Sequence, residues 1–174
     1  EYIFRKQLID RMHIYGEKLA VITSALMFGL FHGNLSQLFY AFALGLVFGY
    51  VYLKTGRLRY SIGLHVLINF IGSVVGPFFL EKLAVLDTME TMDLATLEPI
   101  LPWLLGFGAY VLVLIGLAVT GLVLLCINKR RVSFAPAELE LPKESRFKTV
   151  YVNVGMILLI LGCAALIISN VMML

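Results

Sequence analysis

The sequence lacks several features that would point to particular classes of protein. Its 174 residues include only two cysteines, Cys126 and Cys163. Both lie in apolar segments without CxxC spacing, so we expect buried reduced thiols rather than a disulfide or a metal site. Internal repeats and low-complexity segments are absent from the sequence, as are the repeated halves or broken helices of a transporter.

Apolar side chains are what the sequence has in excess. Hydrophobic residues make up 60% of the chain and its mean hydropathy is +0.93, whereas soluble domains are roughly 45–50% apolar. Five stretches reach or approach the roughly 20 residues that span a bilayer: residues 18–33, 36–53, 61–80, 103–127 and 150–174. We therefore expect an all-α fold, a polytopic transmembrane helical bundle, with the lipid bilayer as its surroundings.

The first residues read as the last turns of a further helix. The chain starts at Glu1 without a methionine and continues directly into an apolar segment. We interpret the sequence as a C-terminal fragment with five full spans and the end of a truncated sixth. A motif-bearing core is expected over residues 1–80. Residues 81–174 are expected to add an acidic loop and two further transmembrane helices to the same membrane domain.

The distribution of cations predicts the orientation of these spans. All lysines and arginines except Lys82 lie in alternate connections, at residues 5–18, 54–59 and 129–148. Cationic loops stay on the cytoplasmic side, so the truncated helix is expected to enter the cytoplasm and Leu174 to finish outside. The net charge of +3 thus indicates topology, and we infer no nucleic-acid partner from it. Short loops and the lack of a targeting signal favour a bacterial cell membrane.

Two histidines within these apolar segments are the strongest indication of function. Phe28 precedes His32 by four residues, and Asn69 follows His65 by four. A polar group in hydrocarbon is costly to leave unpaired, so such residues usually face the bundle interior and are functional. With a helical rise of about 1.5 Å per residue, His32 lies about 15 Å and His65 about 12 Å from the cytoplasmic interface. These similar depths allow the two side chains to meet.

A carboxylate and a guanidinium are expected beside them. If the N-terminal segment folds back around residues 15–17, Glu1 lies opposite His32, because both are equally far from the turn. Arg5 lies one helical turn after Glu1. The expected catalytic residues are Glu1, Arg5, His32, His65 and Asn69. In an apolar pocket a carboxylate or imidazole can act as a general base, and an amide can donate to a developing oxyanion.

Two pairs of glycines one turn apart indicate close helix packing rather than chemistry. They are Gly45 with Gly49 and Gly72 with Gly76. Small residues at this spacing let helix backbones approach closely in lipid.

The order and spacing of these residues resemble three motifs of the CAAX protease and bacteriocin-processing (CPBP, or Abi) family. Glu1 with Arg5 resembles the end of its Glu-Glu-x-x-x-Arg motif, Phe28 with His32 its Phe-xxx-His motif, and His65 with Asn69 its His-xxx-Asn motif. The resemblance covers about residues 1–80. It implies a helical membrane bundle with a cavity open to the cytosol, and an intramembrane endopeptidase activity toward a peptide or protein.

The resemblance also implies a substrate class and a general base. The family cleaves CAAX-type proteins, and bacterial relatives are linked to bacteriocin processing or immunity, so a bacteriocin-system partner is also implied. The family's first glutamate, usually assigned as the water-activating base, would directly precede Glu1, and this fragment is expected to lack it. Starting the motif at Glu1 instead would place Tyr2 and Lys6 at its other positions, which fits worse.

The expected reaction is hydrolysis of a peptide bond by water. The preceding carboxylate, helped by His32, would deprotonate the water. His65 with Asn69 would stabilise the oxyanion, and Arg5 with Glu1 would hold the charges of the site. A glutamate with two histidines is a plausible zinc set, yet the same groups suffice without a metal, so the cofactor stays undecided. A non-catalytic immunity or scaffolding protein of the same fold is the alternative, and a transporter is less favoured.

Overall fold

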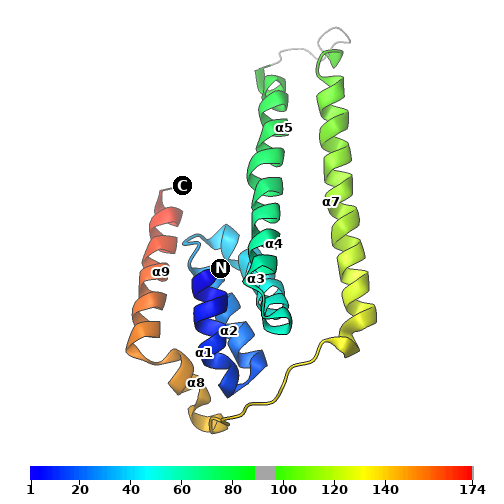
Figure 1. Cartoon of the computed structure of the whole chain (residues 1–174). Coiled ribbons are helices and arrows are strands. Elements are labelled where there is room, and N and C mark those ends of the chain that lie inside the picture. Colours follow the sequence, from blue (N-terminus) through cyan, green and yellow to red (C-terminus); the bar gives the residue numbers. More distant parts are fainter. Residues whose placement is uncertain (89–96, 174) are drawn as a thin grey trace. The chain divides into compact units, whose positions relative to one another are not determined.

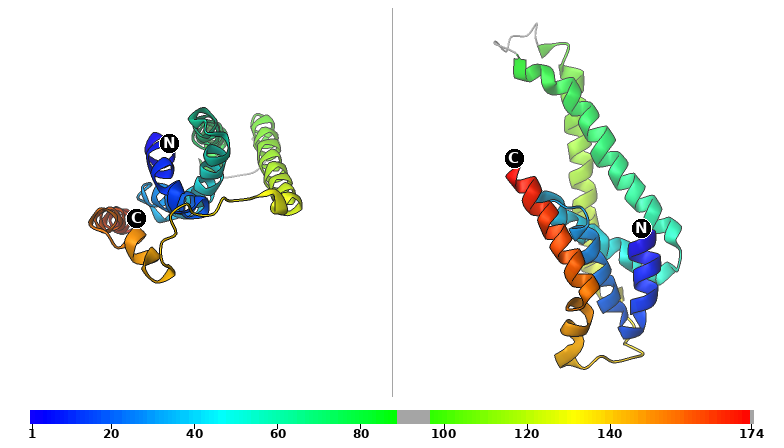
Figure 2. Two further views of the ribbon diagram at one scale, coloured as in Figure 1. Left: turned by 60° about the horizontal axis from the view of Figure 1, so that its bottom comes forward. Right: turned by 90° about the vertical axis from the view of Figure 1, so that its left-hand side faces the viewer.

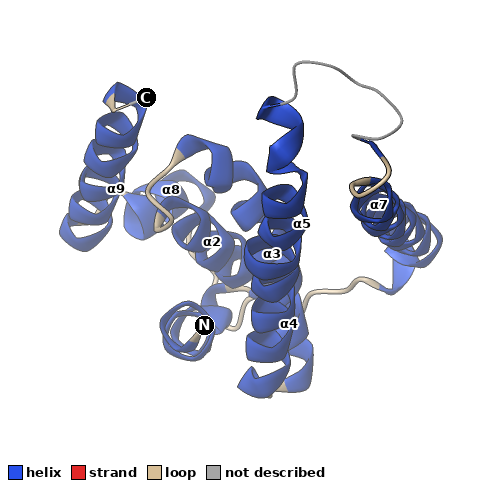
Figure 3. Ribbon diagram, turned by 90° about the horizontal axis from the view of Figure 1, so that it is seen from above, coloured by secondary structure: helices blue, strands red, loops and turns tan. Residues whose placement is uncertain are grey.

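The computed structural model describes residues 1–88 and 97–173, and every regular element within them is a helix (Figures 1 and 3). Contacts divide the chain into two compact units. One comprises Glu1–His65 together with the chain from Phe134 onward, and the other comprises Val66–Ser133. The predicted class, an all-α helical membrane bundle, is confirmed.

The first unit contains the helices that carry most of the motif residues. Its helical elements are η1 Tyr2–Gln7, α1 Leu8–Met12, η2 His13–Tyr15, α2 Glu17–Leu30, α3 Leu35–Thr55, the beginning of α4 Leu58–Phe70, α8 Lys143–Tyr151 and α9 Val154–Met172. The chain folds back at Gly16, whose φ of 116° suits glycine. Figure 2 shows the resulting hairpin, in which η1 and α1 run antiparallel to α2. This turn lies where the sequence predicts it.

Helices α2 and α3 pack closely because glycines lie between them. A Cβ atom on Gly45 would lie 2.9 Å from Cα of Ala25, and one on Gly49 would lie 3.3 Å from Cγ1 of Val21. The first distance is shorter than real Cβ contacts allow, so the close approach depends on glycine. The predicted packing role of this pair is therefore confirmed. A Cβ on Gly72 would meet no described atom within 4 Å, so its predicted role has no support here.

The middle of α2 and the loop that follows it are joined to the C-terminal helices of the same unit. The hydroxyl groups of Thr23 and Tyr151 form a hydrogen bond of 2.8 Å. The side-chain amide of Asn170, on α9, donates to the carbonyl oxygen of Gly33 at 2.8 Å. The loop that begins with His32 is thus held by a residue close to the end of the chain.

The second unit contains the remainder of α4 and the helices that follow it. These elements are η3 Ile71–Val75, α5 Gly76–Leu83, η4 Ala84–Thr88, α7 Leu101–Asn128 and η5 Lys129–Arg131. No residue of α7 is buried. Cys126, on this helix, is a free thiol as expected, but its side chain is exposed rather than buried. Cys163, on α9, is free and buried as expected. Residues 89–96 of the predicted acidic loop lie outside the described residues.

Four helices among the described residues are long and apolar enough to cross a membrane: Leu35–Thr55, Leu58–Asp87, Leu101–Arg131 and Val154–Met172. They correspond to four of the five predicted spans, although Leu174 of the last one lies outside the described residues. The predicted span at 18–33 is wrong as a full span. Its helix, α2, has 14 residues and is about 21 Å long, which is shorter than a hydrocarbon core of about 30 Å.

An extended segment before α8 is attached to the N-terminal hairpin. The Glu17 carboxylate accepts hydrogen bonds of 2.7 Å from Lys54 Nζ and from the backbone N–H of Ala135. The carbonyl oxygen of Ile14 accepts bonds of 2.9 Å from the N–H groups of Glu138 and the residue after it. Glu17 therefore joins α2, α3 and this segment.

We expect Glu17→Gln to weaken the protein in a pH-dependent way. Burial raises the pKa of the Glu17 carboxyl, but the hydrogen bonds from Lys54 and Ala135 outweigh it, so the net pKa lies below its usual value. The stabilisation is therefore full above about pH 4.3, the usual glutamate pKa, and is lost as the pH falls through the lower pKa of the folded state. At neutral pH the substitution should cost about 1 kcal/mol, because the pair is partly exposed.

Thermal unfolding in detergent across acidic and neutral pH measures this effect. The difference in melting temperature between Glu17→Gln and the unsubstituted protein should become smaller as the pH falls toward about 3. Glu144→Gln is the matched control, because this carboxylate is exposed and has no ion pair in the described part of the chain. An equal loss of stability at all pH values would contradict the assigned role of Glu17.

Candidate active site

Arg5 is the buried centre of the candidate site. Its side chain is 0% exposed, and Nε donates to Glu1 Oε2 at 3.0 Å. Its Nη1 donates to Ser24 Oγ at 2.6 Å. The guanidinium carbon lies 4.7 Å from the ring centroid of Phe28 and 5.9 Å from that of Phe48. Buried charge is tolerated only when it is paired and hydrogen-bonded, and the aromatic faces add a cation–π attraction. Arg5 thus holds the Glu1 carboxylate in place.

The other oxygen of Glu1 binds a histidine from α4. Glu1 Oε1 accepts a hydrogen bond of 3.0 Å from Nδ1 of His65, and the two side chains are 6% and 25% exposed. The His65 ring also stacks on Phe48, with ring centroids 5.8 Å apart. The sequence predicts Glu1 opposite His32, and the structure corrects this partner. Helical rise determines the depth of a residue, but not the direction in which its side chain leaves the helix.

His32 lies two residues after the end of α2, in the loop that leads to α3. Its Nδ1 is 2.8 Å from the carbonyl oxygen of Phe28. Because a carbonyl can only accept, Nδ1 must be the donor, and a neutral ring then has its lone pair on Nε2. The same reasoning applies to His65, whose Nδ1 donates to a carboxylate. In both imidazoles Nε2 is therefore the nitrogen left to take a proton.

Phe28 connects the two histidines. Its ring centroid lies 4.9 Å from that of His32 and 5.3 Å from that of His65, and both contacts are edge-on. Glu1, Arg5 and His65 are joined by direct hydrogen bonds or ion pairs, whereas His32 reaches this group through Phe28.

Asn69 is not placed with these residues. It follows His65 by one turn on α4, belongs to the second compact unit and is exposed. Its side chain has no hydrogen-bond partner among the described residues. Its role in stabilising an oxyanion therefore stays a prediction.

Two further residues hold the site and were not predicted from the sequence. Fully buried Ser24 accepts from Arg5 and donates to the carbonyl oxygen of Phe4 at 2.7 Å. Fully buried Ser61 donates to the carbonyl oxygen of Phe48 at 3.0 Å and so joins α4 to α3. A signal for both serines is present in the sequence. Ser24 precedes Phe28 by one turn and Ser61 precedes His65 by one turn, which places them on the motif faces of their helices.

The donor arrangement does not fit a zinc site. No group of three or more His, Cys, Asp or Glu side chains that could hold a metal occurs within residues 1–88 and 97–173. Both carboxylate oxygens of Glu1 accept hydrogen bonds from Arg5 and His65, which leaves this carboxylate without a free oxygen for a metal. Zinc needs several such donors directed at one point, so no step below passes through a metal.

Comparison with known proteins gives one family. No match to the chain was found among curated proteins, and none among solved structures. Residues 1–71 match the family model described as type II CAAX prenyl endopeptidase Rce1-like. This segment contains all three motifs and every side chain of the contacts around Glu1, Arg5 and His65. The resemblance predicted from the motifs is thereby confirmed over this segment, and residues 1–71 are similar to the Rce1-like type II CAAX prenyl endopeptidases.

Proposed function

We propose that the protein is an intramembrane endopeptidase of the CAAX type, which hydrolyses a peptide bond with an activated water molecule. The family match indicates a protease in general, and the apolar helices indicate an integral membrane protein. The observation that carries the proposal is the partly buried contact between the Glu1 carboxylate and Nδ1 of His65, beside the buried Arg5. A carboxylate in this position fixes the tautomer of an imidazole and stabilises its protonated form.

Glu1 is better suited to orient His65 than to activate water. Its Oε2 accepts from Nε of Arg5, and its Oε1 accepts from Nδ1 of His65 and from Nη2 of Arg5, so both oxygens are already engaged in holding these two side chains. In our proposal the base is therefore the family's first glutamate, whose position directly precedes Glu1, assisted by Nε2 of His32. This glutamate takes a proton from the water as the water oxygen bonds to the carbonyl carbon, and His65, protonated at Nε2, donates to the resulting oxyanion together with the Asn69 amide. When the C–N bond breaks, the glutamate gives the proton to the leaving amine. Arg5 and Glu1 balance the charge of the imidazolium.

The proposal includes a substrate class and a cellular location. We propose a CAAX-type protein as the substrate, with a bacteriocin precursor or another peptide as the second class. The alternating distribution of cations supports an active site that opens toward the cytoplasm of a bacterial cell membrane. No nucleic acid takes part in this proposal.

A cleavage assay on membranes that contain the intact protein tests the proposal. The substrate is a farnesylated peptide that ends in a CAAX sequence, and mass spectrometry measures the released C-terminal tripeptide. We expect His32→Ala to lower the rate about a hundredfold, since general base assistance typically contributes at least that factor. Membranes without the protein are the blank. Release equal to the blank by the unsubstituted protein, or full release by His32→Ala, would contradict the proposal.

A further inference from the structure

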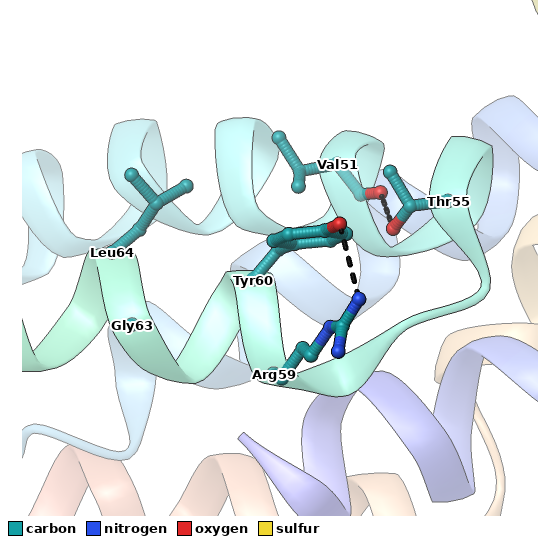
Figure 4. Close-up of a pocket in the computed structure, with 6 residues that line it drawn as sticks. All are labelled: Val51, Thr55, Arg59, Tyr60, Gly63 and Leu64. Carbon is teal, nitrogen blue, oxygen red and sulfur yellow. Dashed lines mark hydrogen bonds between the residues drawn. The ribbon is translucent and has the colours of Figure 1, made fainter.

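A groove between α3 and α4 lies outside the site described above. It has a volume of about 570 Å³ and is lined by Val51, Thr55, Arg59, Tyr60, Gly63 and Leu64 (Figure 4). Val51, Gly63 and Leu64 give it an apolar wall. Arg59 and Tyr60 supply the polar groups, and Figure 4 shows the Arg59 guanidinium directed at the Tyr60 hydroxyl. The groove is therefore apolar along the helices and cationic at one end.

The cationic end lies where two candidate membrane spans meet. Leu35–Thr55 ends and Leu58–Asp87 begins on either side of Gly56, whose φ of 62° makes the turn. Tyrosine and arginine are common at the level of lipid headgroups, where the ring stays in the apolar layer and the charge reaches water. The ends of two spans place this turn at that level.

The two arginines of the turn carry positive charge that the described residues do not neutralise. Arg57 and Arg59 each donate to the Tyr60 hydroxyl at 3.4 Å, and the Arg59 guanidinium lies 5.1 Å from the Tyr60 ring centroid. Neither arginine has an ion pair in the described part of the chain. The neighbouring Lys54, in contrast, pairs with Glu17 at 2.7 Å.

We propose that this groove binds one anionic phospholipid, with an acyl chain along the apolar wall and the phosphate at Arg57 and Arg59. Guanidinium groups bind phosphate oxygens through parallel hydrogen bonds, which lysine does not provide. A groove with an apolar wall and an unneutralised cationic end, at the end of membrane spans, complements an amphiphile with an anionic head. The proposal does not depend on peptidase activity.

Native mass spectrometry of the intact protein in detergent tests the proposal with phosphatidylglycerol and phosphatidylcholine as probes. The unsubstituted protein is expected to retain one phosphatidylglycerol in preference to phosphatidylcholine. Arg59→Gln should lower the apparent affinity about fivefold, the effect of removing one cation close to an anionic lipid. Arg59→Lys should retain more lipid than Arg59→Gln, which separates loss of charge from a general folding defect. Arg130→Gln, at an exposed cation of η5, is the matched control and should bind normally.

Gly63→Leu tests whether the acyl chain occupies the groove. A Cβ on Gly63 would meet no described atom within 4 Å, so the larger side chain can enter the groove without a clash while both arginines stay in place. We expect it to lower phosphatidylglycerol retention at least about fivefold, because the leucine side chain takes the space in which about two CH2 groups of the acyl chain would be buried. Unchanged retention by Gly63→Leu, or equal retention of the two lipids by the unsubstituted protein, would overturn the proposal. One-for-one displacement of the lipid by a farnesylated peptide would also overturn it and assign the groove to substrate.

Discussion

His65→Ala is expected to lower peptide cleavage by the intact protein about a hundredfold or more, because the imidazole takes part in proton transfer or oxyanion stabilisation. Glu1→Gln should cause a similar loss of kcat. A neutral amide cannot stabilise the protonated ring, and it can present its NH2 group to Nδ1 and so favour the other tautomer. The change is expected in kcat more than in KM, since the pair acts on the reacting groups rather than on substrate binding.

The double variant tests whether Glu1 and His65 act as one unit. Residues that act together show strongly non-additive effects, so adding Glu1→Gln to His65→Ala should lower the rate little further. His13→Ala is the matched control. This histidine is exposed, and its Nδ1 lies 2.9 Å from the Asp10 carbonyl oxygen, away from the site. Full turnover by His65→Ala, or strictly additive losses in the double variant, would remove the pair from the mechanism.

Arg5→Met is expected to cause the largest loss of stability, about 3–5 kcal/mol. The substitution keeps most of the side-chain volume but leaves the Glu1 carboxylate, which is 6% exposed, without its guanidinium partner. Ser24 also loses the donor to its hydroxyl oxygen. Arg5→Lys should recover only part of the loss, because an ammonium cannot reproduce both the forked hydrogen bonds and the contact with the Phe28 ring.

Thermal or denaturant unfolding in detergent measures these changes. Combining Arg5→Met with Glu1→Gln should restore much of the stability, since the uncompensated carboxylate is then removed as well. Arg11→Met is the control, because Arg11 is exposed on α1 and has no ion pair within the described residues. Equal stability of Arg5→Met and Arg11→Met would show that the buried ion pair contributes nothing to the fold.

The sequence predicts the helices well but not which of them can span a bilayer. Hydropathy alone makes residues 18–33 resemble a span, because most residues of α2 are apolar. Its ends are determined by backbone geometry instead, at Gly16 and at the loop containing Gly33, where φ is 116° and 69°. Hydropathy averaged over a sliding window does not detect such turns. The result is a short helix packed within the first unit.

Contacts within one helix are easier to predict from the sequence than contacts between helices. The four-residue spacings place Arg5 after Glu1 and Phe28 before His32, and the structure brings these residues together. The pairing of Glu1 with His65 depends on how α4 is rotated against α3, which the buried hydrogen bond from Ser61 to Phe48 helps to determine. Contacts of this kind join residues of different helices, and a single sequence carries no direct signal for them.

The attachment of α2 to the C-terminal helices has a consequence for biosynthesis. The hydrogen bonds Glu17–Ala135, Thr23–Tyr151 and Gly33–Asn170 join residues 118, 128 and 137 positions apart. At about 5–20 residues per second of translation, the N-terminal hairpin leaves the ribosome on the order of ten seconds before these partners exist. The partners of Arg5 all lie within the first 48 residues and are made early. The loop that contains His32 and Gly33, in contrast, has to wait for Asn170 before its hydrogen bond to α9 can form.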